Sequence, residues 1–276
     1  MKKHGLAALF LIAAAALGGA GATISAYQHR EQAGHRDRTA HEEVSQDSQN
    51  LPEKDEINQT FQLAPGAKVE VSGINGPVDI QTSNTGTAEV NIVRSARTKD
   101  DLEYRKITVD QSNGGLVVRG EKEKDRNYRQ VEVRERVSLK IPRQVELTTR
   151  GVNGRVTVGE IDGSVTMSGI NGKVEVAQAG GYAHISGVNG TVGVRISRLG
   201  ENGINVSGVN GKVELRFAED LNADLTVTGI NGPIHTDVSN LTVQGKMNPS
   251  NLRAKIGSGG SPISISGVNG SVTVSR

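Results

Sequence analysis

Two glutamates and two histidines are the side chains of the repeated region whose types are suited to acid–base chemistry. Glu175 and Glu214 occupy matching positions two repeats apart, with Gly193 at the same position between them. A polysaccharide lyase or hydrolase needs acidic side chains on neighbouring repeats, to bind Ca²⁺ or to transfer protons. The acidic row is broken at Gly193, and His184 and His235 have no nucleophile pattern near them. The sequence therefore predicts no catalytic residue and no enzyme. A polysaccharide-active β-helix enzyme is kept as a third alternative, after the two non-catalytic functions given at the end of this section.

Metal and phosphate sites are not predicted either. His29, His35 and His41 are spaced six residues apart, which places them on different helix faces, and no carboxylate pattern completes a site. The chain has no cysteine, which excludes disulfides, thiolate metal sites and lipid attachment through a cysteine. The glycine-rich run 257–260 lacks the aspartate of calcium-binding nonapeptides, and no phosphate-cradling loop occurs. We therefore expect no metal and no cofactor.

Composition also limits the partners. The chain has 32 Lys and Arg against 30 Asp and Glu, a formal net charge of +2, and only 3% aromatic residues with no Trp. A nearly neutral chain has no strong field that attracts nucleic acid. Scarce aromatic side chains leave few surfaces on which bases or sugar rings stack. No nucleic-acid partner is expected.

The N-terminus has the pattern of an export signal. Lys2 and Lys3 precede an apolar core at 6–17, and Ala20-Gly21-Ala22 fits a small-x-small cleavage site. We predict that residues 1–26 are a signal peptide and that the protein is exported to the periplasm or the cell surface.

The alternative to cleavage is an uncleaved anchor that leaves the domain facing outward. The uncharged stretch 5–26 is long enough to span a bilayer, and membrane contact would then be made through this segment alone. Residues 27–58 are polar and poor in large apolar side chains, which predicts a flexible spacer.

One short phrase, Ser/Thr/Arg-Gly-Ile/Val-Asn-Gly-x-Val/Ile, recurs seven times along the chain. The four steps from Asn153 to Asn231 are 18, 18, 21 and 21 residues. A fixed period near 20 residues indicates a repeated structural unit. The Asn-Gly pairs, which we predict to be the turns of the repeat, are Asn75-Gly76, Asn153-Gly154, Asn171-Gly172, Asn189-Gly190, Asn210-Gly211, Asn231-Gly232 and Asn269-Gly270.

Each repeat carries two short runs of alternating apolar and polar residues, which indicate strands. A two-residue Asn-Gly hairpin would place the motif residue Ile170 on the polar side, whereas a four-residue loop or a coil corner keeps one face apolar. The regular period favours stacked coils. We predict an all-β domain over residues 59–276, built as a β-solenoid of two-strand coils of 18–21 residues. The alternative is an antiparallel meander or sandwich.

Two further features concern the ends of this domain. Residues 131–141 alternate in the same way, with Glu135 as the one break in the apolar positions. The last motif ends four residues before Arg276, and no polar cap follows it. The edge of the final coil is then either open or covered by a partner, an earlier segment or a second copy of the chain. A homodimer through the open C-terminal coil is one of the expected partnerships.

The order of the motifs carries a family resemblance. A signal or anchor leads to Gly66-Ala-Lys-Val-Glu-Val-Ser-Gly-Ile-Asn-Gly-Pro-Val-Asp-Ile80, then to Val137-Ser-Leu-Lys-Ile-Pro142, to repeated Asn-Gly-x-Val units and to a closing Ser266-Gly-Val-Asn-Gly-Ser-Val272. Over about residues 60–276 this order resembles the bacterial "putative adhesin" β-strand-repeat family, a domain of unknown function in envelope-associated proteins. The resemblance implies a β-solenoid-like domain outside the cytoplasm, in some cases linked to envelope-stress operons, with no established catalytic residues.

Two functions fit these observations. The first is an exported, non-catalytic cell-envelope protein that binds a polymer or protein partner through a regular β face. The residues that motivate this reading are Ser168, Ser186, Ser207, Thr228 and Ser266. The second is a membrane-anchored structural or sensory module in envelope stress, held near the membrane by the spacer. Retention of the N-terminal anchor would favour the second function, and release of the mature chain would favour the first.

Overall fold

The computed structural model describes residues 51–122, 131–196, 198–217, 221–245, 248 and 250–276. This part of the chain is all β apart from one short helix, α2 (Lys99–Tyr104), which confirms the predicted all-β class. The predicted signal peptide 1–26 and residues 27–50 of the predicted spacer lie outside the described residues. Among the helices of the described ranges, none has the length and apolar character needed to cross a membrane.

The strands of the described residues join into one hydrogen-bonded sheet of 19 strands. Their bounds are β1 (Glu53–Gln62), β2 (Ala67–Ser72), β3 (Val78–Ser83), β4 (Thr87–Ala96), β5 (Arg105–Ser112), β6 (Gly115–Lys122), β7 (Val133–Pro142), β8 (Val145–Arg150), β9 (Val156–Ile161), β10 (Val165–Asn171), β11 (Val174–Ala179), β12 (Ala183–Ile196), β13 (Ile204–Phe217), β14 (Ala223–Asn231), β15 (Ile234–Asp237), β16 (Leu241–Val243), β17 (Leu252–Ile256), β18 (Ser261–Asn269) and β19 (Val272–Ser275).

Neighbouring repeats pair in parallel and in register. Along the strands that precede the Asn-Gly pairs, β10 pairs with β12 and β12 with β13, so that Met167, Ile185 and Val206 lie side by side. Along the strands that follow the pairs, β11 pairs with β12 in the same direction. A meander would instead pair the repeats antiparallel. Like residues of successive repeats therefore form rows across the sheet.

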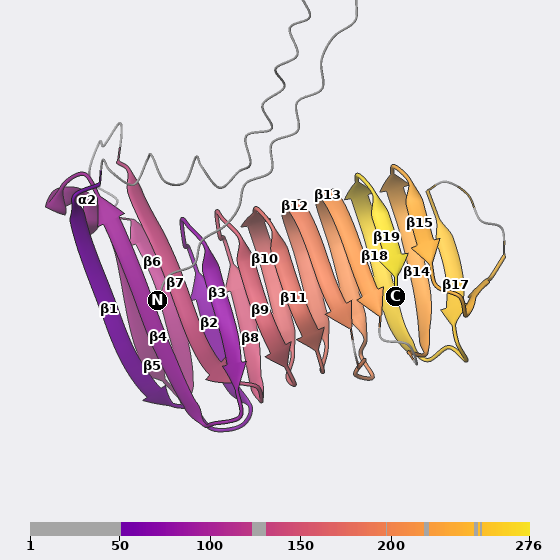
Figure 1. Ribbon diagram of the computed structural model, residues 1–276, viewed down its shortest axis with the longest axis horizontal. Coiled ribbons are helices and arrows are strands. Elements are labelled where there is room, and N and C mark those ends of the chain that lie inside the picture. Colours follow the sequence, from indigo (N-terminus) through magenta and orange to yellow (C-terminus); the bar gives the residue numbers. More distant parts are fainter. Residues whose placement is uncertain (1–50, 123–130, 197, 218–220, 246–247, 249) are drawn as a thin grey trace, which may run out of the picture. The chain divides into compact units, whose positions relative to one another are not determined.

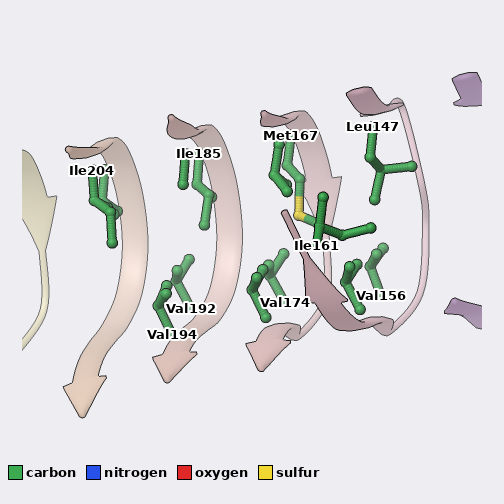
Figure 2. Packing of buried hydrophobic residues seen from close by; sticks show 14 of the residues in the cluster. Leu147, Val156, Ile161, Met167, Val174, Ile185, Val192, Val194 and Ile204 are labelled. Carbon is green, nitrogen blue, oxygen red and sulfur yellow. The ribbon is translucent and has the colours of Figure 1, made fainter. Parts of the chain in front are cut away.

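The apolar residues of both strands in each repeat point into one shared interior. Figure 2 shows Leu147, Met167, Ile185 and Ile204 stacked on one side of this interior, with Val156, Val174, Val192 and Val194 facing them. These side chains are all 2% exposed or less. The motif Ile or Val also turns inward, as the coil-corner alternative requires, and its exposure is at most 3% at Ile74, Val152, Ile170, Val188, Val209, Ile230 and Val268.

The repeats do not stack in chain order. β18 pairs with β13 on one side and with β14 on the other, and β19 likewise lies between β13 and β15. In Figure 1 the yellow strands β18 and β19 accordingly lie between β13 and the β14–β15 repeat. Of the alternatives stated for the edge of the final coil, the structure therefore has the one in which earlier segments of the chain cover it. The expected homodimer required an open edge at the final coil, whereas β18 and β19 are paired on both sides within the chain.

The glycine-rich run 257–260 carries the chain across β14. β17 lies antiparallel on one side of β14, β18 lies parallel on the other side, and this run connects them. The Ser258 backbone N–H donates a hydrogen bond to Asn222 Oδ1 (2.9 Å), which holds the connection against the start of β14. A side chain at Gly257, where φ is +60°, would overlap the Asn222 side chain. This run is therefore the crossover connection between β17 and β18.

The N-terminal end of the sheet is antiparallel. β1 pairs with β4, β4 with β7, and β5 with β6, while β7 joins β3 of the first repeat in parallel. Residues 53–58, which the sequence analysis placed in the spacer, form the first half of β1. Ile57 and Phe61 of this strand pack against the core, which gives β1 an apolar side despite its many polar residues.

Candidate functional site

The seven Asn-Gly pairs, which the sequence predicts to be turns, lie in one line across the paired repeats. Asn189-Gly190 and Asn210-Gly211 lie inside the continuous strands β12 and β13 rather than at a turn between two strands. All seven asparagine side chains join a single chain of amide hydrogen bonds, in the order of the stack rather than of the sequence. The Nδ2-to-Oδ1 bonds run from Asn153 to Asn75 (2.8 Å), Asn171 to Asn153 (3.0 Å), Asn189 to Asn171 (3.0 Å), Asn210 to Asn189 (3.1 Å), Asn269 to Asn210 (3.1 Å) and Asn231 to Asn269 (3.0 Å). We call this line the asparagine row.

The two glycines of the motif meet different requirements. The first, for example Gly187 with φ of +60°, adopts a left-handed conformation that side chains other than hydrogen disfavour. The second, for example Gly190 with φ of +149°, also lies where a Cβ would overlap the carbonyl of Gly172 on the neighbouring repeat. The same overlap with a neighbouring backbone carbonyl occurs at Gly76, Gly154, Gly172, Gly211, Gly232 and Gly270.

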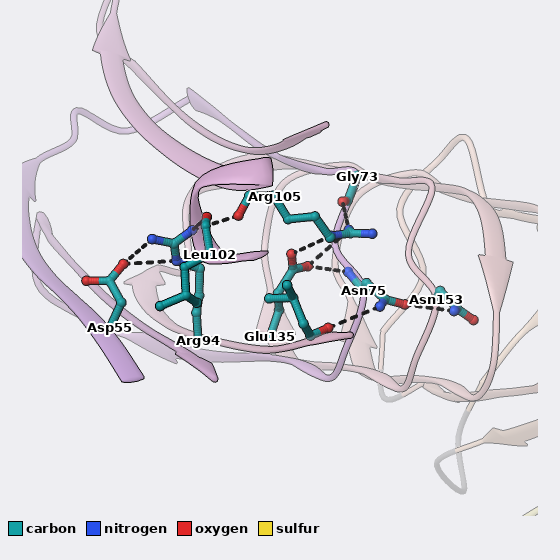
Figure 3. A network of polar contacts seen from close by, with 9 residues as sticks. Asp55, Gly73, Asn75, Arg94, Leu102, Arg105, Glu135 and Asn153 are labelled. Carbon is teal, nitrogen blue, oxygen red and sulfur yellow. Dashed lines mark hydrogen bonds and ion pairs between the residues drawn. The ribbon is translucent and has the colours of Figure 1, made fainter. Parts of the chain in front are cut away.

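A buried carboxylate ends the asparagine row at Asn75 (Figure 3). Further along the row, the backbone N–H of Asn153 donates to the Ile74 carbonyl of the neighbouring repeat (2.9 Å). At Asn75 the backbone N–H donates instead to Glu135 Oε2 (2.5 Å), and its Nδ2 donates to the Val133 carbonyl (3.3 Å). Glu135 therefore takes the place of a missing repeat, which explains the one break in the apolar alternation of β7.

Two arginines hold this carboxylate in place. The Glu135 side chain has no exposed surface and pairs with Arg105, whose Nε lies 3.0 Å from Oε1. Arg105 Nη2 also donates to the Gly73 carbonyl (3.4 Å). Arg94 in turn donates from Nη1 to the Leu102 and Arg105 carbonyls (2.9 and 2.7 Å) and pairs with Asp55. The end of α2 and the start of β5 are thereby fixed so that Arg105 reaches Glu135.

The outward side of the strands that precede the Asn-Gly pairs, which we call the first face, carries two rows of uncharged polar side chains. The row predicted from the sequence runs in spatial order through Ser168, Ser186, Ser207, Ser266 and Thr228. A second row, two residues earlier on each strand, consists of Thr166, His184, Asn205, Ser264 and Thr226. All ten side chains are half-buried, and no Lys, Arg, Asp or Glu interrupts either row from β10 to β14.

An aromatic pair lies on the first face. The rings of Tyr182 and His184 stack with their centroids 6.2 Å apart and their planes 9° apart. Among the described residues, His184 Nδ1 is buried without a hydrogen-bond partner. This pair adds a flat aromatic surface beside the hydroxyl rows, which the low aromatic content of the chain did not predict.

The outward side of the strands that follow the Asn-Gly pairs, the second face, carries the two glutamates. Glu175, Gly193 and Glu214 lie side by side on three adjacent strands. Lys173 Nζ lies 2.6 Å from Glu175 Oε1, and Arg216 Nη2 lies 3.7 Å from Glu214 Oε2. Each carboxylate therefore faces a cation.

The two histidine candidates lie apart from the glutamates. His235 lies two strands beyond Glu214 in the same row, next to Thr273, whereas His184 lies on the first face. In the ranges that the structure describes, no group of three His, Asp or Glu side chains is placed to hold a metal ion.

Two adjoining hollows lie on the second face. The larger, of about 630 Å³, extends over β1, β4, β7, β3 and β9, and its polar lining includes Asn58, Asp79, Asn91, Lys140 and Thr157. The smaller, of about 280 Å³, extends over β9, β11, β12 and β13, and Thr157 lines both. Sequence reasoning missed the larger hollow because the strands that form it are distant in the chain. The smaller one lies over consecutive repeats, and Gly193 between Glu175 and Glu214 is the sequence signal that could have found it.

No protein-family model matches this chain, and no curated protein matches it. Among solved structures, the chain is similar to a "putative cell adhesion protein" from Clostridium sporogenes, with 10% identity and a TM-score of 0.45 over 81% of this chain and 99% of that chain. It is also similar to a "putative adhesin" from Bacteroides fragilis, with 11% identity and a TM-score of 0.35 over 80% and 98% of the two chains. Their names agree with the family that the sequence resembles. A "putative lipid binding protein" from Parabacteroides distasonis has 11% identity and a TM-score of 0.27 over 80% and 97% of the two chains.

Proposed function

We propose that this chain is a non-catalytic, adhesin-like β-solenoid protein of the bacterial cell envelope that binds an extended polymer along its first face. The observation that carries the proposal is the pair of uncharged rows on that face, from β10 to β14. Strands in a sheet are spaced about 4.8 Å apart, so the hydroxyl and amide groups repeat at a constant interval. A polymer presents its own hydrogen-bonding groups at a constant interval and is the partner that such a surface fits best.

The solenoid interpretation rests on the pairing of the repeats. Parallel, in-register pairing, a shared interior and a continuous asparagine row support a stack in which each repeat of 18–21 residues is one coil. The antiparallel strands β1, β4, β5 and β7 at one end and β16 with β17 at the other are end caps in this interpretation. Such caps cover edges that would otherwise pair with other chains.

The envelope location rests on the N-terminal sequence pattern. In the proposed form, residues 1–26 are removed on export and the domain is released into the periplasm or onto the cell surface. The alternative is a membrane-anchored structural or sensory module in envelope stress that keeps this segment. N-terminal sequencing of the protein from fractionated host cells separates the two. A start at Thr23 or Tyr27 in the soluble extracytoplasmic fraction supports release, and an intact N-terminus in the membrane fraction supports the anchored module.

A co-sedimentation experiment tests the first face. The full chain is incubated with insoluble peptidoglycan sacculi and with an insoluble neutral glucan, and the bound fraction is measured against protein concentration. The double substitution Ser186→Glu and Ser207→Glu introduces two charges into the middle of the hydroxyl row, and Thr273→Glu introduces one on the second face as a control. We expect at least tenfold weaker binding of the double variant and unchanged binding of the control. Equal binding of all three proteins would count against the first face.

The absence of catalysis rests on the second face. Glu175 and Glu214 each face a cation, at 2.6 and 3.7 Å, and Gly193 separates the two glutamates. Turnover of an anionic glycan that is abolished by Glu175→Gln or Glu214→Gln would instead support the enzyme alternative.

A further inference from the structure

We propose that the smaller hollow on the second face is a binding site for an oxyanion group, a carboxylate, sulfate or phosphate, carried by an acidic linear polymer. The hollow has a volume of about 280 Å³ and lies over β9, β11, β12 and β13. It is on the opposite side of the repeats from the hydroxyl rows. An experiment that rejects one of the two sites therefore leaves the other untouched.

Gly193 forms the floor of the hollow without a backbone reason to be glycine. Its φ is not in the left-handed region, unlike that of Gly190 three residues earlier. A Cβ at position 193 would have no atom nearer than 3.8 Å and would meet only ordinary van der Waals contacts. A larger side chain thus fits the backbone but fills the space between Glu175 and Glu214. The absence of a side chain at position 193 therefore leaves space that a ligand can fill, and no turn requires a glycine there.

Cations outnumber carboxylates around this space. Lys173, Arg195 and Arg216 line the hollow together with Glu175 and Glu214. The Arg195 residue is exposed, and its side chain has no ion pair or hydrogen bond with any of the described residues. It lies directly beside Arg216 on the neighbouring strand. Like charges at such paired positions destabilise a sheet, and an anion bound between them removes the repulsion.

The donors of the hollow match an oxyanion. The guanidinium groups of Arg195 and Arg216 present parallel N–H donors that fit carboxylate, sulfate and phosphate oxygens in pairs. Thr157 and Thr191 add hydroxyl donors from the adjoining strands. Glu175 and Glu214 remain beside Lys173 and Arg216, so the charge left over for a ligand is positive.

The surroundings indicate a polymer rather than a free ion. A hollow of about 280 Å³ accommodates one charged unit of a longer chain. Arg155 and Lys212 flank the row of Glu175 on exposed positions and extend the positive charge along the stack. A linear chain with regularly spaced acidic groups can therefore place one unit at Gly193 and its neighbours along the second face.

Titration calorimetry on the full chain tests the site. The probes are polygalacturonate, dextran sulfate and a poly(glycerol phosphate), with neutral dextran and inorganic phosphate as comparisons. We expect at least one acidic polymer to bind, with an affinity that falls as salt rises, and neutral dextran not to bind. Inorganic phosphate at the same concentration of charged groups should bind at least tenfold more weakly. Absence of binding by all three acidic polymers, or phosphate binding as tight as theirs, would overturn the polymer site.

Three substitutions locate the binding. Arg195→Ala should weaken polymer binding at least tenfold, and Gly193→Val should do the same without any change of charge. Arg253→Ala, which removes an exposed arginine from β17 outside the hollow, is the matched control and should bind as the natural chain does. Thermal melts establish that each variant is folded. Equal weakening by Arg195→Ala and Arg253→Ala would mean unspecific attraction, and full binding by Gly193→Val would mean that the hollow is not used.

Discussion

Glu135 shows how one buried side chain completes the end of the stack. It accepts the Asn75 N–H that would otherwise face no repeat, and it neutralises Arg105. Removing one partner of a buried ion pair leaves an uncompensated charge, which typically costs about 3–5 kcal/mol. We expect Glu135→Ala to lower the free energy of unfolding by about that amount in urea titrations.

An exposed pair supplies the control for this prediction. Glu132 lies 2.8 Å from Arg97, and its side chain is 41% exposed. Exposed pairs contribute little, so Glu132→Ala should cost less than about 1 kcal/mol. Glu135→Gln should fall between the two because its amide oxygen still accepts the Asn75 N–H. Equal urea midpoints for Glu132→Ala and Glu135→Ala would show that Glu135 does not hold the end of the row.

The asparagine row makes a second prediction at the scale of the residue. Asn189 donates to Asn171 and accepts from Asn210, and a hydrogen bond contributes about 0.5–1.5 kcal/mol net. Asn189→Ala should therefore lower stability by about 1–3 kcal/mol for the two bonds together. Asn50→Ala, in the predicted spacer and outside the described residues, should not change it. Indistinguishable melting temperatures for the two variants would argue against a stabilising row.

At the scale of the element, two glycines of β12 differ in whether the structure has room for a side chain: position 190 has none, and position 193 does. A Cβ at Gly190 would overlap the Gly172 carbonyl, whereas a Cβ at Gly193 meets nothing nearer than 3.8 Å. Gly190→Ala should therefore destabilise the protein clearly. Gly193→Ala should be neutral or stabilise it by about 0.4–1 kcal/mol, because alanine restricts the unfolded chain more than glycine does. Chemical denaturation of both variants measures the difference. A larger loss from Gly193→Ala than from Gly190→Ala would contradict the assigned strand geometry.

The elements also show how far the sequence predicts the fold. Asn113-Gly114 forms a true two-residue hairpin between β5 and β6, and there Val109 pairs with Val118 in phase. In the repeats, a two-residue turn at the same dipeptide would pair Ile170 with Lys173. Whether apolar residues on the two sides of Asn-Gly would pair with each other therefore distinguishes a hairpin from a corner. The sequence alone was enough to reject the two-residue hairpin for the repeats. Phase carries no information on which distant strands become neighbours, so the larger hollow of the second face could not be predicted.

At the scale of the described β domain, the order of the repeats is what the sequence leaves undetermined. Each repeat presents the same apolar slots, corner glycines and asparagine, so every repeat fits beside every other. The connections decide the order. The step from Asn231 to Asn269 is longer than the others because it contains β16 and β17, and these strands lead the chain around β14. The final repeat can therefore enter between two repeats that precede it in the chain.

Cross-linking tests this order directly, because the chain has no natural cysteine. Ser207 pairs with Ser266, and Ser266 pairs with Thr228, so cysteines at either pair lie on adjacent strands about 4.8 Å apart. Cysteines at 207 and 228 lie two strands apart. A short bis-thiol reagent should link 207 to 266 and 266 to 228 quickly, as it links the control pair at 186 and 207, and should link 207 to 228 slowly.

Rapid linkage of 207 to 228 would mean that the repeats stack in chain order and that the last repeat lies outermost. Its far edge would then be open, and the homodimer expected from the sequence would regain its interface. A mixture of single-cysteine chains, one at 207 and one at 266, separates a third arrangement. Linkage between two chains in that mixture requires the final repeat of one copy to lie between β13 and β14 of a second copy. We expect no linkage in this mixture and linkage only in chains that carry both cysteines. The reason is that the short crossover at 257–260 is held against Asn222 of the same chain.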